Sequence, residues 1–235
     1  MGFINADPFM GIISSYRMCW IGGRFGGHKT SLAYMIARNY LEKGYRLITN
    51  NRSVWADNME KINFNERGQL QVVVLLDEGG LYFKNSRQIQ TVASYARKMD
   101  MIYLFPSFYP VARVAQVLTA YAMFNLNSAG IPAYFYKWRV KLGAFQDSGT
   151  FVWWRPSEIY GIYDTLDPGD SGTEIVEWLI KKTGEYRESF GRGSDGVPDM
   201  EENEADQLSD AASAMAEAAD TISAVPFKGR RGRKF

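Results

Sequence analysis

The stretch WIGGRFGGHKTSLAYMIARNYLEKG, residues 20–44, decides the fold. An apolar run at 17–22 leads into a glycine cluster, and the residues after the cluster are apolar at a helical period. Gly44 then provides a C-cap. This order predicts a short buried strand, a glycine-rich turn and a helix that begins where the turn ends.

The glycine cluster follows the phosphate-binding pattern G-x-x-x-x-G-K-[ST] with one departure. When the pattern is aligned on Lys29, it begins at Gly23, and His28 stands in place of the second glycine. Histidine reaches left-handed backbone angles more readily than most residues, at some cost. The expected roles are phosphate contact by backbone N–H groups and Lys29, and Mg²⁺ binding by the Thr30 hydroxyl. The alternative is a plain turn with a solvated lysine. The expected nucleotide-binding residues are Gly23, Gly26, Gly27, His28, Lys29, Thr30 and Ser31.

An acidic pair follows the apolar run VVVLL at 72–76, which is typical of a strand buried on both faces. In a P-loop ATPase, Asp77 would orient Mg²⁺ through water, and Glu78 would act as the general base on the attacking water. The alternative is a pair of acids that simply caps a strand at the surface. Taken together with the glycine loop, the pair predicts ATP and Mg²⁺ as cofactors.

Strand and helix patterns alternate along the chain, which predicts an α/β fold with parallel strands and helical crossovers. Strands are expected at 17–22, 45–50, 70–78 and 99–107, and helices at 29–44, near 57–61, and at 86–98, 109–124 and 173–186. Residues 133–145 and 149–156 predict an antiparallel hairpin around the turn QDSG. The alternating aromatic residues of this hairpin favour sheet packing over stacking on a single nucleic-acid strand.

Composition bounds the organisation of the 235 residues. The formal net charge is +1, so any DNA contact would come from local patches, and one cysteine and one histidine exclude an intrachain disulfide and a zinc cluster. We expect an ATPase domain over 1–190 and a disordered tail over 191–235, which is acidic, then Ala-rich and finally basic. The N-terminus lacks signal-peptide features, and the apolar stretch 101–126 is interpreted as buried core. We therefore expect a soluble protein without a transmembrane segment.

Five motifs occur in an order that resembles the FtsK–HerA superfamily of DNA-pumping ATPases, over about residues 16–145. The motifs are GGRFGGHKTS, GYRLITNN, VVVLLDEGGLYF, YARKMDMIYLFPSF and YKWRV. The sequence is most similar to compact viral members: genome-packaging ATPases of membrane-containing double-stranded DNA viruses, and zonula occludens toxin-like assembly proteins of filamentous phages. The resemblance implies a P-loop NTPase (RecA-like) fold with a mostly parallel central sheet flanked by helices and a C-terminal β-hairpin.

The same resemblance implies an ATP-hydrolysing translocase that pumps DNA through a homohexameric ring, with a capsid or membrane-vertex partner. The expected location is the cytoplasm of the infected host cell, with the virion as a second site. Arg97 matches a region where such proteins place an arginine that acts on a neighbouring subunit's nucleotide, with a helix C-terminal cation as the alternative. Ser107 stands where the family usually has a polar sensor, often glutamine. Other candidate cations are Arg113 for the site and Arg24, Lys84 and Arg87 for the DNA channel.

Two alternatives stay open. The filamentous-phage branch normally carries a membrane-spanning segment, and none is evident in this sequence, which favours the packaging type over a membrane-associated assembly ATPase. The second alternative is a nucleotide-binding scaffold that does not hydrolyse ATP. His28 and the missing sensor glutamine motivate this alternative.

Overall fold

The computed structural model describes residues 2–4, 6–23, 27–83, 85–108, 118–128, 131–142, 145–154, 161–164 and 172–190. The chain divides into two units, Met1–Gly191 and Arg192–Phe235. The second unit, and with it nearly all of the tail expected over 191–235, lies outside the described residues.

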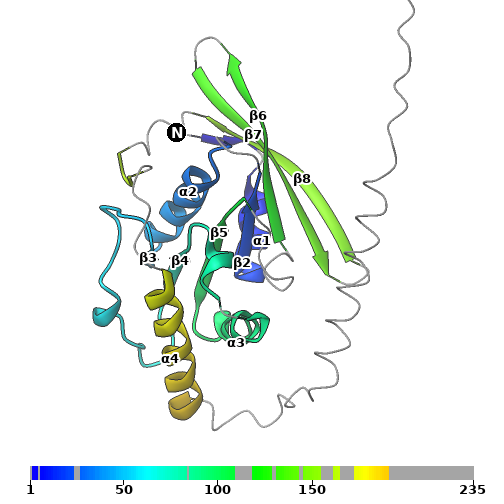
Figure 1. The fold of residues 1–235 in the computed structure, drawn as a ribbon. Helices are drawn as coiled ribbons and strands as arrows, with labels where there is room; N and C mark the ends of the chain where they lie inside the picture. Colours follow the sequence, from blue (N-terminus) through cyan, green and yellow to red (C-terminus); the bar gives the residue numbers. More distant parts are fainter. Residues whose placement is uncertain are drawn as a thin grey trace, which may run out of the picture. The chain divides into compact units, whose positions relative to one another are not determined.

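The first unit is built on an eight-stranded sheet with the order β1-β8-β7-β6-β2-β5-β4-β3 (Figure 1). The strands are β1 (Gly2–Ile4), β2 (Met18–Gly22), β3 (Arg46–Thr49), β4 (Val72–Leu75), β5 (Met101–Pro106), β6 (Leu118–Ser128), β7 (Ile131–Leu142) and β8 (Phe145–Trp154). The strands β3, β4, β5 and β2 pair in parallel, and β6 joins β2 in parallel. The remaining pairs, β6–β7, β7–β8 and β8–β1, are antiparallel.

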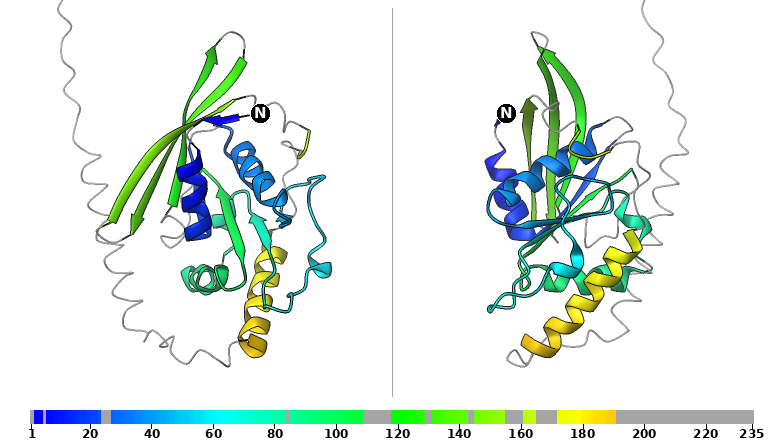
Figure 2. Two further views of the ribbon diagram at one scale, coloured as in Figure 1. Left: turned by 180° about the vertical axis from the view of Figure 1, so that it is seen from behind. Right: turned by 90° about the vertical axis from the view of Figure 1, so that its left-hand side faces the viewer.

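Helices cover both faces of the parallel part of the sheet (Figure 2). The helices are α1 (Asp7–Tyr16), α2 (Lys29–Leu41), α3 (Ser86–Ala96) and α4 (Gly172–Phe190), and two short 3-10 helices are η1 (Met59–Lys61) and η2 (Gly79–Leu81). In β4, Val73 and Leu75 pack with α1 and α2, whereas Val72 and Val74 pack with α3 and α4. The apolar run is therefore uninterrupted because both faces of its strand are buried. The α/β class and the flanking helices are confirmed.

Residues 118–124 form part of strand β6, so the helix predicted over 109–124 is wrong for this part. Residues 109–117 lie outside the described residues. The register Trp20↔Thr119, Ile21↔Ala120 and Gly22↔Tyr121 shows the physical reason. The edge of β2 offers backbone hydrogen bonds to a partner strand, and this tertiary pairing overrides the local helical pattern.

The hairpin of β7 and β8 is confirmed, but its predicted turn is wrong. The strands reverse between the paired residues Leu142 and Phe145, so the segment QDSG at 146–149 lies inside β8. Gly149 pairs with Trp138, and a Cβ at residue 149 would lie 2.7 Å from the Trp138 ring. This glycine makes room for a cross-strand indole and does not form a turn.

Three aromatic residues of the hairpin lie in the core, as the structural interpretation of their spacing predicts. Tyr136, Trp138 and Phe151 are all buried. Phe151 stacks on Tyr136 and, at 4.7 Å between ring centroids, on Phe9 of α1. Neither β1 nor α1 is predicted from the sequence. Within the described ranges, no helix is long and apolar enough to cross a membrane.

Candidate functional site

The candidate site begins at the junction between β2 and α2. His28 occupies the N-cap position of α2 with φ 54° and ψ 36°, the left-handed conformation that its place in the glycine pattern requires. Its carbonyl accepts hydrogen bonds from the Leu32 N–H at 3.0 Å and from the Tyr136 hydroxyl at 3.4 Å. Burial lowers the pKa of the His28 imidazole below its ordinary value, which favours the neutral ring. Through the His28 carbonyl, the junction between β2 and α2 is hydrogen-bonded to β7 as well as to α2.

Lys29, Thr30 and Ser31 form the first turn of α2, where backbone N–H groups lack intrahelical partners. The positive end of the helix dipole also lies there. Among the glycines of the loop, Gly23 has φ 141° and Gly27 is buried, while Gly26 lies outside the described residues. A helix start of this kind is suited to binding an anion.

Thr30 and Asp77 are in direct contact. The Thr30 hydroxyl donates a hydrogen bond of 2.8 Å to Asp77 Oδ2. The two residues follow β2 and β4, and the order of the sheet places β5 between these strands. The loop and the acidic pair, which the sequence analysis singled out separately, thus meet at one carboxyl edge of the sheet.

Burial raises the pKa of the Asp77 carboxyl above its ordinary value of 3.8. The hydrogen bonds from Thr30 and Asn51 and the positive charge of Lys29 oppose this shift. The result is a partly buried carboxylate next to a hydroxyl and an ammonium group. Carboxylate and hydroxyl oxygens are the ligands that Mg²⁺ takes from proteins, usually one or two of them together with phosphate and water oxygens. Thr30 and Asp77 therefore fit a magnesium ion.

Glu78 adopts a left-handed conformation with φ 52°, and its N–H donates to the Pro106 carbonyl at 2.8 Å. Its two carboxylate oxygens lie 3.1 and 3.2 Å from the Phe108 N–H, which donates to them. Burial raises the pKa of the Glu78 carboxyl, and the Phe108 N–H opposes the shift. A Cβ at Gly79 would lie 2.6 Å from the Phe105 ring, so a glycine follows Glu78 for lack of space.

Asn50 and Asn51 also belong to the site, although the sequence analysis assigned them no role. The Asn50 amide accepts from the Asp77 N–H at 2.8 Å and donates to the Asp77 carbonyl at 3.0 Å. Asn51 Nδ2 donates to Asp77 Oδ2 at 3.3 Å. Both asparagines follow β3 directly, and the ends of parallel strands meet at one edge. Placing them beside the acidic pair requires the strand order, in which β3 lies next to β4.

Ser31, predicted to contact the nucleotide, has its hydroxyl 2.7 Å from the hydroxyl of Tyr163 and is itself buried. The Tyr163 ring stacks on Tyr34 with a centroid distance of 4.3 Å and an interplanar angle of 6°. A residue from the segment 161–164 thus supports the first turn of α2.

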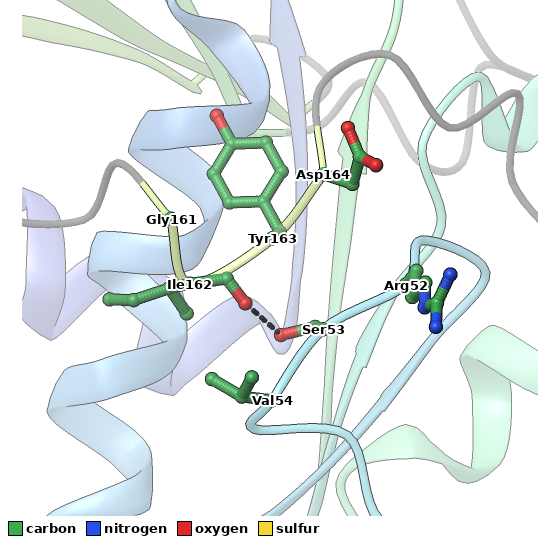
Figure 3. Close-up of a pocket in the computed structure, with 7 residues that line it drawn as sticks. All are labelled: Arg52, Ser53, Val54, Gly161, Ile162, Tyr163 and Asp164. Atoms are coloured by element: carbon green, nitrogen blue, oxygen red, sulfur yellow. Dashed lines mark hydrogen bonds between the residues drawn. The ribbon is translucent and has the colours of Figure 1, made fainter.

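The segment 161–164 lies against the loop that follows β3 (Figure 3). The Ser53 hydroxyl and the Val54 N–H both donate to the Ile162 carbonyl, and the Asp164 N–H donates to the Arg52 carbonyl. A cavity of about 470 Å³ lies between the two segments. The lining residues are Arg52, Ser53, Val54, Gly161, Ile162, Tyr163 and Asp164.

The structure does not bring Arg97 to the acidic pair of its own chain. Arg97 follows α3, and its guanidinium donates to the Ser15 carbonyl at 2.8 Å, near the end of α1. Strand β5 follows Arg97 in the chain and crosses the sheet, and Ser107 comes directly after its far end. Ser107 is buried and accepts a hydrogen bond of 2.9 Å from the Trp20 indole.

The candidate DNA-contact cations are described only in part. Arg87 is exposed in the first turn of α3. Arg24 and Lys84 lie outside the described residues, as does Arg113, the other candidate cation of the site.

Comparison with known proteins adds no family: no protein-family model matches the chain, and no curated protein matches it. The fold and the site define an α/β protein with a parallel sheet flanked by helices. At the carboxyl edge of that sheet, a glycine-rich helix start faces two acids.

Proposed function

We propose that the protein is a P-loop ATPase of the RecA-like class. The observation that carries this proposal is the hydrogen bond between the Thr30 hydroxyl and the Asp77 carboxylate. It joins the two oxygen donors that a phosphate-bound Mg²⁺ needs, at the start of a helix whose first residue is a lysine. The order β6-β2-β5-β4-β3, with one strand between the loop strand and the acidic strand, also supports this class.

Each residue has a defined role in this proposal. The loop and the first turn of α2 bind the phosphates through backbone N–H groups, and Lys29 neutralises charge on the β- and γ-phosphates. Thr30 and Asp77 would hold Mg²⁺, which would supply positive charge beside the phosphates when bound. Glu78 orients a water molecule and accepts its proton. The Phe108 N–H fixes the direction of the Glu78 carboxylate before the water arrives.

We propose further that ATP hydrolysis drives double-stranded DNA through a homohexameric ring, most simply into a viral capsid. The support is the order of sequence motifs shared with the FtsK–HerA superfamily. The position of Arg97 bears on assembly. Because Arg97 lies at the opposite edge of the sheet from Glu78, a catalytic role for it requires the site of a neighbouring subunit.

A nucleotide-binding scaffold is the second candidate function. The observation that favours it is the hydrogen bond from Trp20 to Ser107, because it engages the hydroxyl that stands at the expected sensor position. Such a scaffold would bind ATP through the same loop without DNA-stimulated turnover.

The decisive experiment measures ATP hydrolysis by the purified protein with and without double-stranded DNA, with Lys29→Ala as the control. DNA-stimulated hydrolysis that disappears in Lys29→Ala supports the motor. Nucleotide binding without hydrolysis, unaffected by Glu78→Gln, supports the scaffold. Sedimentation of the wild-type protein with host membranes would favour the zonula occludens toxin-like alternative.

A further inference from the structure

We propose that Asn50 is the positioning residue of the acidic pair: its side chain holds the Asp77 backbone so that the Asp77 carboxylate meets Thr30 and the Glu78 carboxylate meets the Phe108 N–H. This inference rests on the nucleotide site proposed above and adds a residue that neither the glycine pattern nor the acidic pair contains. Asn50 itself contacts neither phosphate nor metal in the proposed site, and it acts through Asp77.

The contact is a closed pair of hydrogen bonds. Asn50 Oδ1 accepts from the Asp77 N–H at 2.8 Å, and Asn50 Nδ2 donates to the Asp77 carbonyl at 3.0 Å. Holding the N–H and the carbonyl of the same residue restrains the dihedral angles on both sides of its Cα. A third hydrogen bond, from Asn50 Nδ2 to the Tyr82 hydroxyl at 3.1 Å, extends the restraint beyond η2. Asn50 is only 3% exposed, so solvent does not compete for these bonds.

The place of Asn50 in the sheet explains why a side chain is needed there. The paired register of β3 and β4 ends at Thr49↔Leu75. Beyond this point the backbone of β4 turns toward η2 and leaves the regular ladder. The amide of Asn50 resembles a peptide group in its donor and acceptor, so it continues the β3–β4 pairing past the last strand residue.

The acidic pair needs this support because its conformation is unfavourable in isolation. Glu78 has φ 52°, and a left-handed non-glycine residue persists only where its surroundings hold it. The β5 side supplies one set of restraints, through the Pro106 carbonyl and the Phe108 N–H. Asn50 supplies the matching restraint from the β3 side.

The two neighbouring asparagines contact different groups of Asp77. Asn50 holds the Asp77 backbone, whereas Asn51 donates to the carboxylate oxygen that also accepts from Thr30. Substitution of Asn50 therefore removes no group of the proposed Mg²⁺ site. It removes the two hydrogen bonds that hold the Asp77 backbone. The expected defect is in the response to Mg²⁺ and in turnover, with binding of metal-free ATP retained.

The test compares Asn50→Ala with Asn65→Ala in the full chain. Asn65 is a matched control because its side chain also holds two backbone groups, the N–H groups of Arg67 and Gln69, each at 2.9 Å, but in an exposed turn. ATP affinity is measured with EDTA and with Mg²⁺, and kcat with Mg²⁺. We expect Asn50→Ala to change the EDTA affinity less than twofold and to lower kcat and the Mg²⁺-dependent gain in affinity at least tenfold. Asn65→Ala should leave all three within twofold.

Amide hydrogen exchange supplies a readout that does not depend on ATP. Asn50→Ala should accelerate exchange of the Asp77 N–H at least tenfold, and Asn65→Ala should leave it unchanged. If Asn50→Ala does not fold, Asn50→Asp replaces it. That variant keeps the acceptor for the Asp77 N–H and lacks the Nδ2 donor, so exchange should stay slow while the Mg²⁺ response falls.

Two outcomes separate this inference from the proposed function. A wild-type protein that binds ATP, together with an Asn50→Ala variant that keeps both the Mg²⁺ response and slow exchange at Asp77, overturns the inference alone. A wild-type protein that binds no ATP overturns the proposed function and the functional half of the inference. Accelerated exchange in Asn50→Ala would then still support the positioning of the acidic pair.

Discussion

Thr30 Oγ1 lies 2.8 Å from Asp77 Oδ2, although the strands that precede these two residues are separated by β5. The contact spans 47 positions of sequence. It places the start of α2 directly against the acidic turn that follows β4. A magnesium ion with its phosphate ligands would enter a site whose two protein oxygens are already adjacent.

Substitution of Thr30 tests this preorganisation. Thr30→Ser keeps the hydroxyl, so the Mg²⁺-dependent gain in ATP affinity should stay within threefold of wild type. Thr30→Ala removes the hydroxyl that we propose binds Mg²⁺, together with a partly buried hydrogen bond, so the gain should fall at least tenfold, and stability by about 1 kcal/mol. Titration with a fluorescent ATP analogue, with and without Mg²⁺, measures both effects. Equal Mg²⁺ responses in Ser and Ala variants would contradict the assigned role of the hydroxyl.

The raised pKa of Asp77 predicts how stability depends on pH. In the unfolded chain this carboxyl ionises at its ordinary value of 3.8, and burial raises that value in the folded protein. The folded state therefore binds the proton more tightly, and this group's contribution lowers stability as the pH rises from 3.8 through the folded pKa. Without Mg²⁺, Asp77→Asn should unfold at a higher Tm than wild type at neutral pH.

The difference in Tm between Asp77→Asn and wild type should shrink as the pH falls below 3.8, because both side chains are then neutral in either state. Thermal unfolding across the pH range measures it, in buffers free of divalent cations. Asp57→Asn is the matched control, since Asp57 is exposed and accepts a backbone hydrogen bond from Leu47. A stabilising effect of Asp77→Asn that is the same at every pH would rule out the ionisation as its cause.

His28 offers a test of backbone strain at the loop. Because His28 has φ 54°, glycine should relieve strain there, and His28→Gly should keep or raise stability, by up to about 1 kcal/mol. His28→Val should lower stability by about 1–2 kcal/mol, since a β-branched residue tolerates this conformation poorly. Urea denaturation gives both values. Loss of ATP binding in His28→Gly, without loss of stability, would instead identify the imidazole as a nucleotide ligand.

The Ser31–Tyr163 contact predicts a coupled pair. Tyr163→Phe removes the 2.7 Å hydrogen bond but keeps the stacking on Tyr34, so it should cost about 1 kcal/mol of stability. Ser31→Ala should cost a similar amount, and the double variant should cost less than the two added together. A double-mutant cycle in urea measures this coupling. Strict additivity would mean that the two hydroxyls do not interact in solution.

The proposed role of Arg97 in the site of a neighbouring subunit predicts that two inactive variants recover hydrolysis when they are mixed, which only an oligomer allows. If Arg97 serves a neighbouring subunit, Arg97→Ala and Glu78→Gln should each abolish most hydrolysis, whereas a mixture of the two proteins should recover part of it. Mixed subunits would form some sites with both an intact glutamate and an intact arginine. Hydrolysis assays over a range of mixing ratios test this. Wild-type hydrolysis by Arg97→Ala alone would leave Arg97 as a surface cation held on the Ser15 carbonyl.

Local sequence patterns predicted the parts of the fold that depend on local chemistry. The apolar run before Asp77 marks a doubly covered strand, and the glycine pattern anticipates the left-handed angle at His28. The strand β6 was missed because its conformation depends on pairing with β2, which no local window reveals. Gly149 was misread for the same reason, since the space it leaves is filled by a residue of another strand.

The residues of the candidate site also separate into those that local sequence patterns reveal and those that depend on distant partners. Thr30 and Asp77 belong to recognisable motifs, so their meeting could be predicted. Asn50 lies in the motif GYRLITNN but had no assigned role, and Tyr163 lies in no motif; their contacts are with partners 27 and 132 positions away in the sequence. Placing Asn50 would have required the strand order, whereas placing Tyr163 required the structure itself.

The distant partner of Ser31 also sets an order of events during synthesis. A nascent chain that has left the ribosome only as far as β5 contains the glycine loop, the acidic pair and both asparagines, but neither β6 on the other side of β2 nor Tyr163. The central strand gains its second neighbour, and the first turn of α2 its buried hydroxyl partner, only after most of the domain has been translated. A growing polypeptide therefore has a first turn of α2 without the Ser31–Tyr163 contact until Tyr163 emerges from the exit tunnel.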